Sequence, residues 1–228
     1  EPGGEITLEA NPGSFERERF RAFRAAGVTR LSIGVQSFDD DKLRALGRVH
    51  DRAQAIAAVE EAAASFDTFN IDLMYALPGQ SPAQCEADVR QALSFAPPHL
   101  SVYHLTLEPN TEFAAKPPKL PDSDLAYEML EQGQTLLADA GYAHYEVSAY
   151  ARPGRPAAHN LNYWRFGDYL GIGAGANGKR TLAGQVLRRA RHKHPKTYLE
   201  TAGSAASLQE ERIVAGGELA FEYLLNSL

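Results

Sequence analysis

Phe69-Asn-Ile-Asp-Leu-Met-Tyr-Ala-Leu-Pro-Gly-Gln-Ser-Pro-Ala-Gln84 contains a strand, a sharp turn and the start of a helix. The apolar and β-branched run at 69–74 predicts a buried strand, which the Leu77-Pro78-Gly79 turn ends. Ser81 and Gln84 have the spacing of a capping box, with proline at the first helical position between them. A helix is therefore expected to run from this point to about Phe95.

The same strand–turn–helix unit recurs on both sides of this stretch. Short apolar or β-branched runs predict further strands at Glu5–Glu9, Arg30–Val35 and His99–Leu107. The intervals at 14–27, 39–46 and 51–66 have helical patterns. Because parallel strands joined by helices form right-handed crossovers, this order predicts an α/β fold. A partial (β/α) barrel and a doubly wound sheet both fit the pattern.

The character of the sequence changes after residue 115. Lys116-Pro-Pro-Lys-Leu-Pro121 predicts a stiff connection, followed by a helix at Asp122–Ala140, a strand at Tyr142–Tyr150 and a helix from about Leu208 to Leu228. We therefore expect a partial barrel at 1–115 and a small α+β region at 116–228. The last helix has no C-cap and the first strand begins almost at once, so we expect truncation at both ends.

Composition excludes several classes of protein. The 228 residues include 23 Lys and Arg against 29 Asp and Glu, a net charge of −6. An acidic chain argues against sequence-independent nucleic-acid binding, which needs many phosphate contacts from cations. Cys85 is the single cysteine, so neither an internal disulfide nor an all-cysteine metal site can form within these residues. We expect a cytoplasmic protein that does not bind nucleic acid.

Three polar residues mark the carboxyl ends of the predicted strands. Glu9 ends the first strand, Gln36 follows the second, and Asp72 lies in the second half of the third. In parallel α/β folds this edge of the sheet is where ligands bind. Each residue alone fits a capping or surface role as well. Three of them on successive strands favour a binding site.

The glycine-rich segment Gly173-Ala-Gly-Ala-Asn-Gly-Lys179 resembles a phosphate-binding P-loop. That motif needs a serine or threonine next to hold magnesium, and Arg180 stands there instead. The segment is better interpreted as a turn where the backbone passes close to a neighbour or a ligand.

A basic strip follows, from Lys179 to Lys196, with seven Lys or Arg residues at 179, 180, 188, 189, 191, 193 and 196, together with His192 and His194. The strip fits a solvated edge hairpin defended by charge and, equally, a contact for the carboxylates of an anionic ligand or an acidic partner. A metal site at His192 and His194 lacks a third ligand.

The most unusual segment is His159-Asn-Leu-Asn-Tyr-Trp164, which follows a loop rich in proline and glycine. It fits a capped turn whose hydrogen bonds are satisfied. It also fits an exposed imidazole with aromatic walls, which suits an axial ligand to the iron of a flat macrocycle.

An ordered set of motifs closely resembles the radical S-adenosylmethionine (SAM) proteins related to oxygen-independent coproporphyrinogen III oxidase. The motifs are Leu8-Glu-Ala-Asn-Pro-Gly13, Arg30-Leu-Ser-Ile-Gly-Val-Gln-Ser-Phe38, Leu46-Gly-Arg48 with His50, Ile71-Asp-Leu-Met-Tyr75 and Leu77-Pro-Gly-Gln80. Ser148-Ala-Tyr-Ala151, His159-Asn-Leu-Asn-Tyr163 and Phe166-Gly-Asp-Tyr-Leu-Gly-Ile-Gly-Ala-Gly175 resemble its heme chaperone branch. The resemblance implies a partial (β/α) barrel of the radical SAM type.

Residue by residue, the resemblance implies a SAM site formed by Glu9, Gln36, Arg48 and Asp72. Carboxylate and amide groups can bind ribose hydroxyls, and a guanidinium can pair with the methionine carboxylate. Three of these four residues also stand at the predicted strand ends.

The resemblance also implies that His159 ligates heme iron, with Asn160 and Tyr163 as its motif partners. The family's 4Fe–4S cluster is held by three cysteines that are expected upstream of residue 1, and Cys85 is not one of them. Asn177 stands where the family usually has a histidine, so no second imidazole is expected at that position.

The resemblance implies a heme chaperone with three cofactors, namely heme, SAM and the cluster. Such a protein passes heme to an acceptor. The sequence does not identify this acceptor, and an acceptor that is associated with a membrane is compatible with it. Oligomeric state stays open. The alternative is an oxygen-independent coproporphyrinogen III oxidase, which decarboxylates two propionates. Because heme transfer breaks no bond in the porphyrin, whether the protein is an enzyme also stays open.

Overall fold

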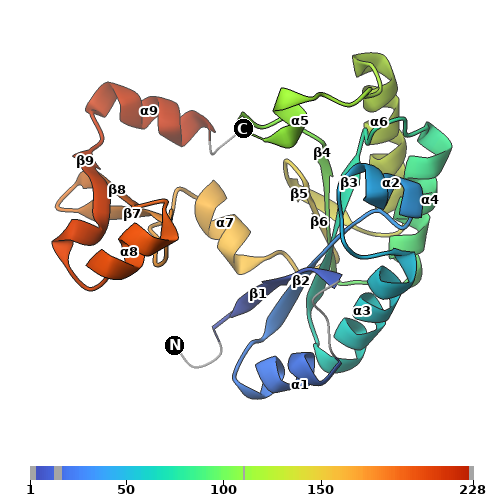
Figure 1. The fold of residues 1–228 in the computed structure, drawn as a ribbon, viewed down its shortest axis with the longest axis horizontal. Coiled ribbons are helices and arrows are strands. Elements are labelled where there is room, and N and C mark those ends of the chain that lie inside the picture. The colour runs from blue at the N-terminus through green and yellow to red at the C-terminus, as the bar shows by residue number, and fades with distance from the viewer. Residues whose placement is uncertain (1–3, 13–16, 110, 226–228) are drawn as a thin grey trace. The chain divides into compact units, whose positions relative to one another are not determined.

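The chain divides into two compact units, Glu1–Ala157 (unit 1) and Ala158–Leu228 (unit 2), in a computed structural model that describes residues 4–12, 17–109 and 111–225 (Figure 1). The boundary expected after residue 115 lies inside unit 1. The helix that follows it packs on an earlier helix, and the strands after that join the same sheet.

Unit 1 is built on a six-stranded sheet in the order β1-β2-β3-β4-β6-β5. Its strands are β1 (Thr7–Ala10), β2 (Arg30–Gln36), β3 (Phe69–Tyr75), β4 (His99–His104), β5 (Ala143–Glu146) and β6 (Ala149–Ala151). The first four strands pair in parallel and in sequence order, whereas β6 pairs antiparallel with both β4 and β5. The α/β prediction is confirmed, since successive parallel strands with intervening helices match the βα repeat of a barrel.

Six helices in unit 1 are described. They are α1 (Arg17–Ala25), α2 (Asp40–Ala45), α3 (Arg52–Ser65), α4 (Pro82–Ser94), α5 (Glu112–Ala115) and α6 (Ser123–Asp139). The expected start of the first helix at Ser14 lies outside the described residues. The capping box of Ser81 and Gln84 forms as predicted, with the Ser81 side chain accepting from the Gln84 amide.

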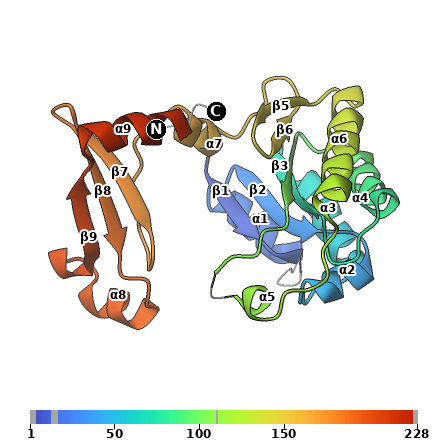
Figure 2. The same cartoon turned by 90° about the horizontal axis from the view of Figure 1, so that it is seen from above.

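A layer of helices covers one face of this sheet. Figure 2 shows α3, α4 and α6 lying along it, and α1 packs on α3. Alternate strand residues, among them Ile33, Ile71 and Leu73, are buried in the core that includes residues of these helices. Because side chains alternate across a strand, the residues between them must lie on the opposite face of the sheet. In β2 and β3 they include the polar residues Ser32, Asn70 and Asp72.

The single strand expected at Tyr142–Tyr150 is wrong. The chain turns at Val147 and Ser148, so that β5 and β6 form an antiparallel hairpin. The Glu146 carboxylate accepts a hydrogen bond from the Ser148 amide at 3.2 Å, which stabilises the turn.

Unit 2 is a three-stranded antiparallel sheet with short helices. The elements are α7 (Ala158–Trp164), β7 (Asn177–Leu182), β8 (Gln185–Arg191), α8 (Pro195–Thr201), the 3-10 helix η2 (Ala205–Ser207), β9 (Leu208–Ile213) and α9 (Gly216–Leu225). The helix expected to begin at Leu208 is wrong in its first third, because 208–213 pair with β8. Among the described residues, no helix is long and apolar enough to cross a membrane.

The glycine-rich segment is a close backbone approach, as the sequence indicated. Tyr169 and Lys179 form an isolated β-bridge, which brings Gly171 against Asn177. A Cβ atom on Gly171 would lie 2.2 Å from the Asn177 carbonyl oxygen, so no other residue fits there without a shift of the backbone.

Candidate functional site

A polar cluster occupies the face of the unit 1 sheet opposite to the helical layer. Ser32 on β2 pairs in register with Asn70 on β3, and Asp72 pairs with Ser101 on β4. The Asn70 side-chain amide donates to Asp72 Oδ1 at 2.6 Å, and the Ser32 hydroxyl donates to Asp72 Oδ2 at 3.2 Å. The Asp72 carboxylate is therefore held in one orientation by donors on two strands.

The environment of Asp72 favours its neutral form more than water does. Burial and, to a smaller extent, the negative charge of Glu9 raise the pKa of this carboxyl to about 6, against the opposing effect of hydrogen bonds from Asn70, Ser101 and Ser32. Asp72 is therefore mostly ionised at pH 7, and it becomes mostly protonated one to two pH units lower.

Gln36 has an unusual backbone at the end of β2. Its φ is 69°, in the left-handed region that non-glycine residues avoid, and the β2–β3 register shifts between Ile33 and Gln36. The buried side chain accepts a hydrogen bond from the Tyr103 hydroxyl at its Oε1 atom, at 2.7 Å. Backbone strain of this kind costs about 1–3 kcal/mol and concentrates at ligand sites.

Arg48 reaches the same strand ends through Asn11. Its Nη1 atom donates to Asn11 Oδ1 at 3.1 Å. A Cβ atom on Gly34 would lie 2.9 Å from Gln36 Nε2 and 3.2 Å from Asn11 Oδ1, so the missing side chain of Gly34 leaves room for both amides. The guanidinium, two amides and a glycine thus form one continuous surface.

Tyr103 on β4 interacts with all four predicted side chains, through one hydrogen bond to Gln36 and through the charges of the other three. Burial and the charges of Asp72 and Glu9 raise the pKa of its phenol, while the hydrogen bond to Gln36 and the charge of Arg48 act in the opposite direction. Glu9, Gln36, Arg48 and Asp72 therefore all lie within electrostatic reach of one hydroxyl. The structure brings together every residue that the sequence proposed for this site.

Six residues of the cluster were missed by the sequence analysis: Asn11, Ser32, Gly34, Asn70, Ser101 and Tyr103. A usable signal was present, because parallel strands buried on both faces are apolar throughout, whereas here polar residues alternate with apolar ones. That alternation indicates a polar face within an α/β sheet.

The donor set fits a nucleoside that carries an amino-acid tail. Carboxylates at Glu9 and Asp72 can accept from ribose hydroxyls, the Gln36 amide can donate and accept, and Arg48 can pair with a carboxylate. A cluster that sets two cations, Arg30 and Arg48, beside two carboxylates is less suited to a triphosphate.

The His-Asn-x-x-Tyr motif lies on a helix, α7, rather than on the capped turn that was one of the two expectations. Residues four apart share a helix face, so His159 and Tyr163 lie on the same side of α7. The Tyr163 side chain is 46% exposed, and its ring packs edge-on against Tyr169 with 4.9 Å between ring centroids. An imidazole and a partly exposed phenol are thus presented together.

The C-terminal end of α7 is fastened by Asn162. Its side-chain amide donates to the Asp168 carbonyl at 3.1 Å, and its own carbonyl accepts from the Gly167 amide at 2.7 Å. A Cβ atom on Gly167 would lie 2.0 Å from Asn162 Oδ1. Asn162 and Gly167 therefore stabilise the C-terminal end of α7, the helix that carries His159 and Tyr163.

The basic strip is not a uniformly solvated edge. Lys179 is buried, donates to Asp168 Oδ1 at 3.0 Å, and lies 4.0 Å from the centre of the Phe166 ring. Arg188 pairs with Glu222 at 2.6 Å, and its other amino group donates to the Tyr169 hydroxyl. These cations therefore hold unit 2 together.

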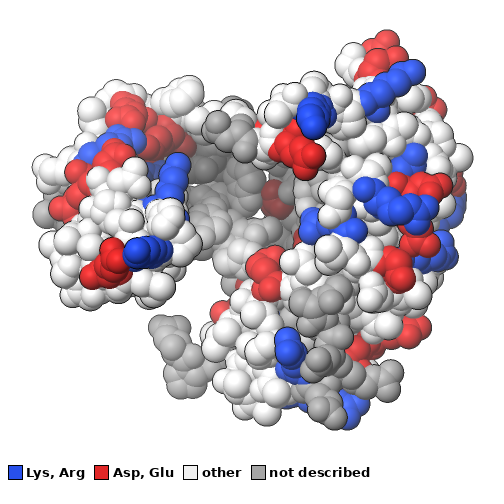
Figure 3. All heavy atoms as spheres, in the orientation of Figure 1, with Lys and Arg blue, Asp and Glu red and all other residues white. Residues whose placement is uncertain are grey.

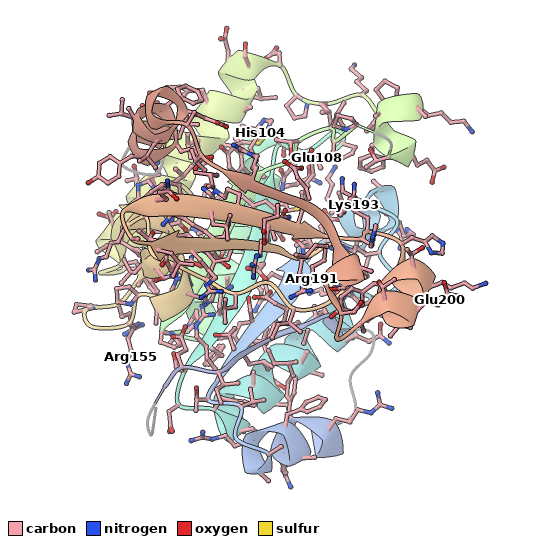
Figure 4. The ribbon with its side chains drawn as sticks, turned by 90° about the vertical axis from the view of Figure 1, so that its left-hand side faces the viewer. His104, Glu108, Arg155, Arg191, Lys193 and Glu200 are labelled. Carbon is pink, nitrogen blue, oxygen red and sulfur yellow. The ribbon has the colours of Figure 1, made fainter. Side chains whose placement is uncertain are left out.

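Two further cations of the strip, Arg189 and Arg191, also have partners within unit 2. Arg189 pairs with Glu211 across β8 and β9, and Arg191 donates to Ser207 and to the Gly171 carbonyl. Figure 3 shows Lys and Arg interleaved with Asp and Glu on the visible face of unit 2. Figure 4 labels Arg191 and Lys193 at the end of β8 and Glu200 on α8. A purely basic surface is not present on that face.

Metal-binding side chains do not gather within the described residues: no group of three His, Cys, Asp or Glu could hold an ion there. Cys85 is buried in α4, and burial together with the charge of Asp88 raises the pKa of its thiol to about 12. A buried thiol of this kind is chemically inert.

The chain is similar to several known proteins. The model of the radical SAM superfamily matches residues 1–92. The heme chaperone HemW of Haemophilus influenzae is 52% identical over 224 residues, 97% of this chain and 57% of the relative. HemW of Escherichia coli is 49% identical over 224 residues, 97% of this chain and 58% of the relative. The chain thus spans somewhat more than half the length of these curated relatives.

Among solved structures, Escherichia coli coproporphyrinogen III oxidase, HemN, a radical SAM enzyme, superposes with a TM-score of 0.84. The superposition covers 100% of this chain and 56% of that one, at 24% sequence identity. At this identity the similarity shows the fold, which is a radical SAM fold represented in part.

Proposed function

The chain belongs to the radical SAM superfamily, within which it is a HemW-like sequence, and on that premise we propose that the whole protein is a heme chaperone. It binds heme and passes it to an acceptor protein. The observation that carries the proposal is the placement of His159 and Tyr163 on one face of α7.

His159 is the proposed ligand of the heme iron. Neutral imidazole is a common axial ligand, and a helix gives it a defined direction. Asn160 and Tyr163 are proposed to line the heme beside it, since Tyr163 supplies an aromatic ring with a hydroxyl that can reach a polar group. Transfer of the heme to its acceptor requires no bond of the porphyrin to break.

Glu9, Gln36, Arg48 and Asp72 are proposed to hold SAM. Arg48 pairs with the methionine carboxylate, while the carboxylates and the Gln36 amide bind the nucleoside. SAM bound at a 4Fe–4S cluster supplies one-electron chemistry, and the cysteines for that cluster are not in this chain. The role of the residues present is to bind and orient the nucleoside.

The acceptor is a protein whose identity stays open, as does its association with a membrane. We propose that transfer takes place in the cytoplasm. The single cysteine is a buried thiol in α4, which fits a reducing compartment.

The test is a hemin titration of the reconstituted full-length protein, followed by its Soret absorbance, with wild type and His159→Ala. His194, an exposed histidine outside the motif, provides the control variant His194→Ala. Saturable one-to-one binding that His159→Ala abolishes and His194→Ala retains is the expected result. Binding that survives His159→Ala would contradict the proposed ligand.

The same preparation separates the chaperone from the oxidase. Absence of specific hemin binding, together with anaerobic conversion of coproporphyrinogen III, would replace the chaperone with the decarboxylating enzyme. The fold is compatible with both activities, so only this pair of measurements distinguishes them.

A further inference from the structure

A chain of short hydrogen bonds crosses the sheet of unit 1 from Asp72. Asn70 joins Asp72 at 2.6 Å, and its other side-chain atom, Oδ1, lies 2.6 Å from His99 Nδ1. The second ring nitrogen of His99 lies 2.6 Å from the Tyr145 hydroxyl. The hydroxyl in turn accepts from the backbone amide of Ala157 at 3.1 Å.

The donors and acceptors run in one direction along this chain. The ionised Asp72 only accepts, so Asn70 presents its NH2 group to Asp72 and its carbonyl to His99. His99 therefore carries its proton on Nδ1, and its Nε2 accepts the hydroxyl proton of Tyr145. With the Ala157 amide donating to Tyr145, every bond points toward the carboxylate of Asp72.

The middle of this hydrogen-bond chain is buried, and each of its members there is bonded on both sides. His99 is 0% exposed and Asn70 is 1% exposed. Asn70 also donates to Ser32 and accepts from Ser101, so both of its polar atoms are shared between strands. A buried polar network costs stability unless it is complete, and when complete it holds its members in one arrangement.

The far end of the chain is the last residue before α7. Ala157 is buried, and His159 follows it by two positions. Its amide donates to a side chain of β5, so Tyr145 fixes the backbone at the point where the helix with the His-Asn-x-x-Tyr motif begins.

We propose that Tyr145 is a positioning residue for two sites at once: it orients the Asp72 carboxylate through His99 and Asn70, and it anchors the Ala157 amide ahead of His159. The identity of the two ligands, SAM and heme, rests on the proposed function. The positioning role rests on the four hydrogen bonds.

Tyr145→Phe in the reconstituted full-length protein tests the role, because it removes one hydroxyl and keeps the ring beside His99. Tyr142→Phe is the matched control: its hydroxyl donates to the Pro97 carbonyl and accepts from Arg152 Nε, and neither partner belongs to the hydrogen-bond chain of Asp72. Three quantities are measured in both variants: SAM affinity as a function of pH, hemin affinity, and deuterium exchange of the Ala157 amide.

We expect Tyr145→Phe to weaken SAM binding by about threefold to tenfold, as the loss of one hydrogen bond implies. Hemin binding weakens as well, and the Ala157 amide exchanges faster. Tyr142→Phe leaves all three unchanged. Exchange needs no ligand, so it reports on the anchor even if the protein binds no heme.

The pH profile separates positioning from a general loss of stability. The charged and titratable groups that act on Asp72 or lie beside it are Glu9 on β1, Arg30 on β2, and Tyr103 and His99 on β4. Tyr145→Phe replaces none of them, although it removes a hydroxyl that acts on Arg30 and bonds to His99. A looser Asn70 gives less support to the Asp72 carboxylate. The pH below which SAM binding is lost should therefore move upward in Tyr145→Phe and stay constant in Tyr142→Phe.

A folded Tyr145→Phe variant with wild-type SAM affinity, pH midpoint and Ala157 exchange would overturn the proposal. If that variant does not fold, His99→Leu is used instead, because it breaks the hydrogen-bond chain at its centre. His99→Leu should weaken SAM binding more than Tyr145→Phe, and unchanged SAM binding in it would also overturn the proposal. Absence of hemin binding in wild type would instead remove the proposed function, while the SAM and exchange results still decide the role of Tyr145.

Discussion

Tyr103 on β4 donates its hydroxyl proton to the side chain of Gln36, at the end of β2, at a distance of 2.7 Å. The contact spans β3, which lies between the two strands in the sheet. It holds a glutamine whose backbone is in a strained conformation, with φ of 69°. Because the backbone of Gln36 and its Oε1 atom are both held, its Nε2 group points in one direction, which is what a binding site requires.

Removal of this hydroxyl should weaken ligand binding without unfolding the protein. We expect Tyr103→Phe to reduce SAM affinity about fivefold, because one hydrogen bond contributes about 1 kcal/mol. Isothermal titration of the reconstituted full-length protein measures the change. Tyr150→Phe is the control, since the hydroxyl of the buried Tyr150 interacts with Gln134 on α6. Equal affinities in the two variants would contradict a role for Tyr103.

A methyl group at position 34 should also act on the site rather than on the fold. In Gly34→Ala the new Cβ atom would lie 2.9 Å from Gln36 Nε2, an atom that can move away at small cost in stability. SAM affinity is expected to fall about threefold or more as Gln36 and Asn11 shift, by the loss of about one hydrogen bond.

The matched variant for Gly34→Ala is Gly133→Ala in the middle of α6, where a Cβ atom meets nothing within 4 Å. It should raise the free energy of unfolding by about 0.5–1 kcal/mol, as alanine does in a helix, and leave SAM affinity unchanged. A large loss of stability in Gly34→Ala, with unchanged SAM affinity, is the result that would count against the proposed site.

The stability of unit 1 should depend on pH through Asp72. Because its pKa is raised from 3.8 to about 6, the folded state binds more protons than the unfolded state between these values, and stability falls as pH rises through this range. Asp72→Asn removes this cost. At pH 7 the variant should be more stable than wild type, by at most about 3 kcal/mol.

Denaturant unfolding at pH 7 and near pH 4 checks the Asp72 prediction, since the difference between variant and wild type should shrink at the lower pH. SAM binding should weaken in the same variant, because a neutral amide replaces the carboxylate. A variant less stable than wild type at pH 7 would show that the hydrogen bonds outweigh the burial of charge.

Asp168 should have the opposite pH dependence in unit 2. The Thr181 amide and the Lys179 ammonium hold the pKa of Asp168 at about 2, below its usual value of 3.8. Its contribution is present above pH 4 and is lost as pH falls toward 2. Asp168→Asn should speed amide exchange in β7 at pH 7, and Asp124→Asn, at the exposed start of α6, should not.

Charge reversal in the basic strip should have different effects at Arg188 and Arg180. In Arg188→Glu the new carboxylate faces Glu222, so unit 2 loses an ion pair and gains a repulsion. Arg180→Glu should leave the fold intact, since no ion pair of Arg180 is found among the described residues. Hemin affinity in Arg180→Glu is therefore the cleaner test of the expectation that the basic strip contacts the carboxylates of an anionic ligand, which in heme are the propionates. Unfolding of Arg180→Glu would show that this residue is structural too.

The order of elements in unit 1 could be predicted from the sequence because it depends on local signals. Capping boxes, turn residues and runs of apolar residues act over a few positions, and the observed bounds of β3 and α4 follow them closely. The hairpin at Val147 and the strand at Leu208–Ile213 could not be predicted in this way. Their conformation depends on pairing with β4 and β8, which lie far away in the sequence.

For the candidate site, the sequence by itself determined which side chains stand at the strand ends and, through its motifs, the family. Only the tertiary structure decided how they meet. The strand register places Asp72 beside Ser101, the bulge before Gln36 turns that residue toward Tyr103, and the loop after α2 brings Arg48 to Asn11. The same holds for Tyr145, because hydrogen bonds between residues more than ten positions apart leave no local pattern, and only the packed sheet brings His99 and Ala157 to one hydroxyl.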